Sequence, residues 1–119
     1  MTRKEYLNRL NGVAIKRDLV GRIETVYCCN LPTEIQQMIS FSPESVFFDD
    51  DYRVLSLSEV LVAQDDLHVD FKGAGMIPII DCGDNDFIVY HICDKNWSKC
   101  NIVDETVFKR RPSLAELLI

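Results

Sequence analysis

The clearest pattern in the chain is a pair of apolar runs, MIPII and FIVYHIC, separated by the polar segment DCGDND. Apolar runs on either side of a short segment with glycine and aspartate are typical of a β-hairpin, here with a loop longer than two residues. In the second run, residues 87, 89, 91 and 93 alternate with residues 88, 90 and 92, and both sets are mostly apolar. We therefore expect this strand inside a sheet, with both of its faces covered.

Helical spacing dominates the chain before this hairpin. Apolar residues three or four apart, with charged residues between them, predict one helix over residues 3–11 and a second over about 13–27. Pro32 opens a third helix, because its missing N–H costs nothing in a first turn. Ser56 and Glu59 have the spacing of a capping box, which predicts the start of a fourth helix between them.

The remaining segments supply strands, turns and a last helix. Residues 46–48 and 52–55 are short β-prone runs on either side of an acidic turn, and residues 97–103 can form another strand. Residues 73–75, Gly-Ala-Gly, are expected to be a flexible joint. The Ser-x-x-Glu spacing near the end predicts a final short helix over residues 114–119.

After the short helix over residues 3–11, the order of these elements is α-α-β-β-α-β-β-β-α, which favours the α+β class. The 119 residues fit one domain, with a largely antiparallel or mixed sheet covered by helices. Pro78 has no N–H to donate, so its strand is expected at an edge, or bonded on one side only at that residue. The basic run at residues 109–111 is expected to be a solvated loop.

The net charge of −6 is distributed unevenly along the chain. Residues 41–105 hold fourteen acidic and four basic side chains, a balance of −10, and each end of the chain has a balance of +2. This charge disfavours a nucleic-acid ligand, because phosphate contacts need clustered Lys and Arg, and it suits a basic protein partner. The charged N-terminal segment is unlike a secretory signal, and no apolar window could span a membrane, so a cytoplasmic location is expected.

Two groups of side chains raise the question of a metal. Asp81, Asp84 and Asp86 are closely spaced carboxylates, but the EF-hand spacing is absent, and a role in shaping the turn is favoured. The other group is Cys82, His91, Cys93 and Cys100. Its spacing lacks the paired ligands of structural zinc sites, and no nucleophile motif accompanies it, so buried free thiols and a core histidine are favoured. No catalytic, cofactor-binding or metal-binding residue is therefore assigned.

Four segments stand out by their order and spacing: 23–24 with 31–35, 53–60, 77–90, and 108 with 113–118. Together they resemble the SUKH superfamily of bacterial immunity proteins and fungal cell-wall-synthesis regulators. Two features depart from the family: Asn85 stands where members often carry another glycine, and the last helix is short. The resemblance implies a SUKH-like α+β fold and a protein that binds another protein and is not an enzyme.

The resemblance implies an immunity protein that neutralises a cognate toxin, such as a nuclease, by direct binding. An acidic surface would then meet a basic toxin domain. Two alternatives stay open: a regulatory domain that binds another cellular protein, and a small metal- or thiol-dependent enzyme. Trp97 is expected in the core, with an interface anchor as the alternative. The candidate partner-binding residues are Asp49, Asp50, Asp51, Asp84, Asp86 and Trp97.

Overall fold

The centre of the protein is a six-stranded antiparallel sheet whose strands lie side by side in chain order. The computed structural model describes residues 1–118. In this range the prediction of a single α+β domain is confirmed, with a sheet that is antiparallel throughout. The strands are β1 (Val46–Phe47), β2 (Arg53–Val54), β3 (Met76–Gly83), β4 (Asp86–His91), β5 (Asn96–Asn101) and β6 (Val107–Arg111).

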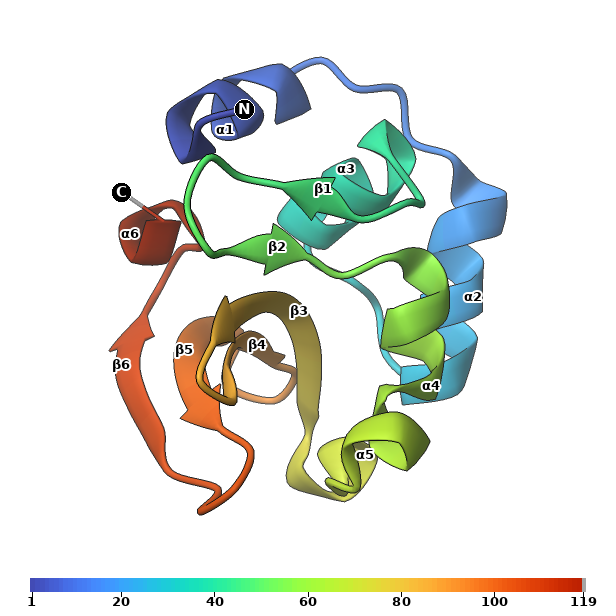
Figure 1. Cartoon of the computed structure of the whole chain (residues 1–119). Helices are drawn as coiled ribbons and strands as arrows, with labels where there is room; N and C mark the ends of the chain where they lie inside the picture. Colours follow the sequence, from blue (N-terminus) through green and yellow to red (C-terminus); the bar gives the residue numbers. More distant parts are fainter. Residues whose placement is uncertain (119) are drawn as a thin grey trace.

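Six helices within the described residues surround this sheet. In Figure 1 the strands β3 to β6 curl into a trough seen nearly end-on, and the β1–β2 hairpin crosses above it. Helices α2 and α4 lie side by side at one flank, where the Tyr27 hydroxyl donates a hydrogen bond to the Val60 carbonyl at 2.8 Å. The helices are α1 (Arg3–Leu10), α2 (Arg17–Tyr27), α3 (Thr33–Phe41), α4 (Leu57–Leu67), α5 (Phe71–Ala74) and α6 (Ala115–Leu118).

The β3–β4 hairpin forms the middle of the sheet, as the sequence predicts. Residues 87–91 of β4 are all buried although their side chains alternate between the two faces of the sheet, and β4 pairs with β3 on one side and with β5 on the other. The expectation of a long loop is wrong. Only Asp84 and Asn85 connect the strands, and both have positive φ, at 53° and 65°. A two-residue turn of this kind matches the right-handed twist of the paired strands.

Pro78 lies in an interior strand and bonds on one side only. It stands opposite Val89 of β4, whereas the register with β2 begins at Ile80, two residues further on. The β2 ladder comprises only the pairs with Ile80 and Asp81, so the proline lies beyond its end. The second of the two expected arrangements is therefore confirmed.

Helix α4 begins with the predicted capping box. The Ser56 hydroxyl accepts a hydrogen bond from the Glu59 N–H at 3.2 Å, and the Glu59 carboxylate accepts one from the Ser56 N–H at 2.9 Å. Helix α2 begins at Arg17, not near residue 13, which corrects the predicted start. The reason is local: Gly12 has a φ of 79°, and Ile15 is 37% exposed and so gains no burial that would favour a helical turn.

Two further elements differ from the sequence-based expectation. The segment expected as a flexible joint forms the end of the short helix α5 and its C-cap, Gly75. Asp70 caps the start of this helix, because its carboxylate accepts a hydrogen bond from the Gly73 N–H at 3.0 Å. The basic run expected as a loop lies in the edge strand β6, which is almost wholly exposed and shows no apolar alternation. Lys109 has a φ of 54°, and the pairing with β5 is irregular beside it. A kinked edge with lysine and arginine discourages pairing with another chain.

None of the helices within residues 1–118 is long and apolar enough to cross a membrane.

Candidate functional site

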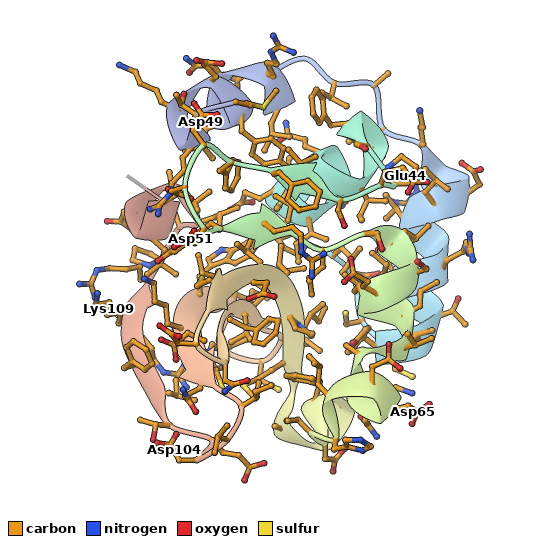
Figure 2. All side chains as sticks on the ribbon, in the orientation of Figure 1. Glu44, Asp49, Asp51, Asp65, Asp104 and Lys109 are labelled. Carbon is orange, nitrogen blue, oxygen red and sulfur yellow. The ribbon has the colours of Figure 1, made fainter. Side chains whose placement is uncertain are left out.

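The acidic turn between β1 and β2 is already neutralised in part by residues of the same chain. The Met1 amino group lies 2.6 Å from Asp49, and the Arg3 guanidinium lies 2.7 Å from Asp50. The hydrogen bond from the Tyr52 N–H, followed by Arg3, lowers the pKa of the Asp50 carboxyl. Asp51 has no ion pair with any residue of 1–118. Figure 2 shows Asp49 and Asp51 at this turn, close to α1 and α6.

The β3–β4 turn presents a second group of carboxylates. Asp81 has the turn-shaping role that the sequence predicts, because its carboxylate accepts a hydrogen bond from the Gly83 N–H at 2.9 Å. Its other oxygen lies 3.6 Å from the Arg53 guanidinium, so the charge of Asp81 already has a partner within the chain. Asp84 is exposed at the turn itself, and Asp86 is half-buried at the start of β4.

The side chain of Asn101 ties this turn to the turn between β5 and β6. Its amide nitrogen donates to the Asp86 carboxylate at 2.9 Å and to the Asp84 carbonyl at 3.3 Å. Its amide oxygen accepts from the Val103 N–H at 3.0 Å and from the Asp104 N–H at 3.4 Å. One amide therefore holds two turns that are distant in sequence at the same end of the sheet.

These two turns form a surface that we call the acidic tip, defined as Asp84, Asp86, Val103, Asp104 and Glu105. None of its four carboxylates forms an ion pair within the part of the chain that the structure describes. Val103 is 74% exposed, the largest value among the exposed large apolar residues. Figure 2 shows Asp104 pointing outward from the connection between β5 and β6. The tip therefore combines an exposed apolar residue with unpaired negative charge.

The field of the tip reaches the sheet interior. Burial raises the pKa of the Cys100 thiol, and the negative charges of Glu105, Asp104 and Asp86 raise it further. The three carboxylates therefore favour the neutral thiol over the thiolate.

The structure narrows the set of predicted contact residues. Asp84 and Asp86 are brought together in the tip, whereas Asp49, Asp50 and Asp51 lie at the separate β1–β2 turn. Val103, Asp104 and Glu105 were missed, because the sequence pattern extends the strand to residue 103 and shows no following hairpin. The signal that could have found them is the Asn101-Ile-Val-Asp-Glu segment, which has turn-forming residues at both ends.

Trp97 lies in the core, as expected, and is not an exposed rim residue. It is 1% exposed and packs against Tyr90, with ring centroids 5.0 Å apart. Its place among the candidate contacts stays a prediction, and it lines a groove together with Tyr90.

The cysteines and histidines do not assemble into a metal site within residues 1–118, where no group of three potential ligands lies together. The His91 Nε2 atom lies 2.6 Å from the Ser98 hydroxyl, so the buried histidine has a partner in the core. Burial, followed by the charge of Arg110, lowers the pKa of His91. The expectation of buried free thiols is confirmed for Cys100 and is wrong for Cys93, which is exposed.

No protein-family model and no curated protein matches the chain. The SUKH resemblance stays a prediction that rests on the four sequence segments. Those segments fall on α2 and α3, on β2 with the start of α4, on the β3–β4 hairpin, and on the end of the chain from β6 to α6.

Proposed function

We propose that this protein is a non-enzymatic binding domain of the immunity type, which neutralises a basic toxin domain by direct contact through the acidic tip. The observation that carries the proposal is the gathering of four unpaired carboxylates around the exposed Val103. The SUKH resemblance supplies the class of partner, and the charge balance of residues 41–105 agrees with it.

The arrangement of the tip suits a protein interface. Binding energy at interfaces is concentrated in central apolar contacts, which a polar rim shields from water. Val103 provides the apolar contact, and Asp84, Asp104 and Glu105 provide exposed charge around it. Carboxylates without an ion pair break none when they meet lysine or arginine, unlike Asp50, which already pairs with Arg3.

The charge of the tip would act chiefly on the rate of encounter. A nuclease must carry positive charge to hold phosphate, and an opposite field raises association rates by about 10–1000-fold at low salt. An immunity protein that meets its toxin soon after the toxin enters the cell benefits from fast association.

The test uses a triple variant of the tip, Asp84→Asn, Asp104→Asn and Glu105→Gln. These changes keep the acceptor oxygens, including the Asp104 oxygen that caps the Thr106 N–H at 2.9 Å. The matched control removes three exposed charges elsewhere, with Glu44→Gln, Asp65→Asn and Asp66→Asn. Each variant is co-expressed with the toxin encoded beside the gene, and association is followed by stopped flow at several salt concentrations.

We expect the tip variant to associate at least about tenfold more slowly at low salt, with a weaker salt dependence, and to protect cells poorly. The control should retain protection. Equal rates for the tip variant and the wild type would exclude the tip as the contact surface. Failure of the wild type to bind or rescue would reject the immunity function itself.

A further inference from the structure

A groove of about 600 Å³ lies at the end of the β4–β5 hairpin opposite the acidic tip. Its floor contains Tyr90 and Trp97, which are paired across β4 and β5, whereas the tip begins at the pair Asp86 and Asn101. The two pairs are four steps apart along β4, a distance of about 14 Å. The groove lies between the segment 28–32, the β4–β5 turn and Pro112.

The floor of the groove carries two hydrogen-bonding atoms without a protein partner. Tyr90 is 5% exposed and Trp97 is 1% exposed, so both side chains are more than nine-tenths buried. Within residues 1–118, neither the Tyr90 hydroxyl nor the Trp97 indole nitrogen is hydrogen-bonded. The Tyr6 hydroxyl is the one side-chain atom of this range that is both unbonded and fully sealed from solvent, so the atoms of Tyr90 and Trp97 are not sealed. Because both residues line the groove, their polar atoms are open to it.

Both atoms act as donors at neutral pH. The indole nitrogen can only donate. Burial raises the pKa of Tyr90, and the charge of Glu34 raises it further, so the phenol keeps its proton. Lys95 adds an ammonium group at the rim and forms no ion pair with the described residues. The lining is mixed, and its apolar part comes from Leu31, Pro32, Ile92 and Pro112.

We propose that this groove binds an extended, proline-containing peptide segment, whose backbone carbonyls accept hydrogen bonds from Trp97 and Tyr90. Proline has a carbonyl but no N–H, so a proline-containing segment supplies acceptors and brings few donors that the floor could not satisfy. Such a segment is already extended in solution and loses little entropy on docking against aromatic and proline side chains.

The charges at the rim orient the segment. Lys95 favours an acidic residue of the segment beside it, and Glu34 disfavours one beside its own carboxylate. This inference does not depend on the acidic tip, because the two surfaces share no residue.

The test uses the single tryptophan, whose indole N–H gives one signal in a ¹⁵N-labelled protein. A blocked decapeptide with proline at alternate positions and one terminal aspartate is titrated to about 2 mM. The control peptide replaces every proline with glycine and keeps the charge. We expect a saturable shift of the Trp97 indole signal with the proline peptide and much weaker binding of the glycine peptide.

Two variants assign the contacts. Tyr90→Phe keeps the ring and should weaken binding by about 2–10-fold, as expected for one hydrogen bond. Lys95→Ala changes an exposed turn residue and should weaken binding and remove the preference for aspartate. Asp104→Asn, in the tip, should bind the peptide as the wild type does. An indole signal that stays fixed at 2 mM, equal binding of the two peptides, or unchanged binding by Tyr90→Phe would overturn the proposal.

Discussion

The Glu59 carboxylate joins a helix start to the sheet, and its replacement gives the sharpest test of how the fold is held. One of its oxygens, Oε1, accepts hydrogen bonds from the Arg53 guanidinium at 2.7 Å, the Ser45 hydroxyl at 2.9 Å and the Ser56 N–H at 2.9 Å. The change Glu59→Gln keeps the length of the side chain and an oxygen for the capping box, and removes only the charge.

The magnitude follows from the pKa of this group. Burial acts to raise the pKa of Glu59, but the hydrogen bonds from Arg53, the Ser56 backbone and Ser45 outweigh burial and lower it from 4.5 to about 2. A full shift of that size would be worth about 3 kcal/mol, at about 1.4 kcal/mol for each pH unit. The side chain is 38% exposed, so solvent screening reduces the value, and we expect about 1–2 kcal/mol at pH 7.

The pH dependence has a definite sign. Because the folded pKa lies below the unfolded value, the stabilisation is complete above about pH 5 and is lost as the pH falls toward 2. Urea unfolding of the wild type and Glu59→Gln should therefore differ by about 1–2 kcal/mol at pH 7, by roughly half of that or less at pH 3, and converge as the pH approaches 2. Glu44→Gln changes an exposed carboxylate, and its free energy of unfolding should match that of the wild type at pH 7 and at pH 3. A difference between wild type and Glu59→Gln that is absent at pH 7, or equally large at pH 3, would refute the argument.

Three further changes probe other features of the structure. Tyr6→Phe removes a buried hydroxyl that has no partner within residues 1–118, and should leave the free energy of unfolding unchanged or raise it by about 1 kcal/mol, measured by urea unfolding. A loss of more than about 1 kcal/mol would contradict the absence of a hydrogen-bond partner. Asn85→Gly relieves a positive φ and should stabilise the β3–β4 turn by about 0.5 kcal/mol, whereas Asn85→Ala should lose about 1 kcal/mol; reversal of this order in thermal unfolding would reject the turn geometry. Asn101→Ala removes four hydrogen bonds at the tip, and hydrogen exchange at the Val103 and Asp104 amides should accelerate; unchanged exchange would show that the turns hold themselves.

The parts of the fold that sequence predicts well are those that local interactions decide. The capping box at Ser56 and Glu59 forms as expected, because its hydrogen bonds connect residues three apart. The buried stripe of α3 also forms as expected at Ile35, Met38 and Ile39, because helical periodicity alone brings these residues to one face.

The errors occur where pairing partners are distant or burial is absent. Strand β6 is exposed over most of its length, so it has no alternation to reveal it, and only its pairing with β5 makes it a strand. The β3–β4 loop is shorter than expected, because pairing of Gly83 with Asp86 extends the ladder into the polar segment. Apolar patterning cannot show that extension, since a sheet ladder is held by backbone groups of any residue.

The sequence by itself determined the class of the fold, its central hairpin and the excess of negative charge in the middle of the chain. Only the tertiary structure decided where that charge is available. Asp50 is paired with Arg3, and Asp81 lies beside Arg53, whereas Asp86 and Asp104 meet at one end of the sheet through Asn101. The physical reason is that an ion pair or a shared surface depends on distances across the fold, which residue order does not contain.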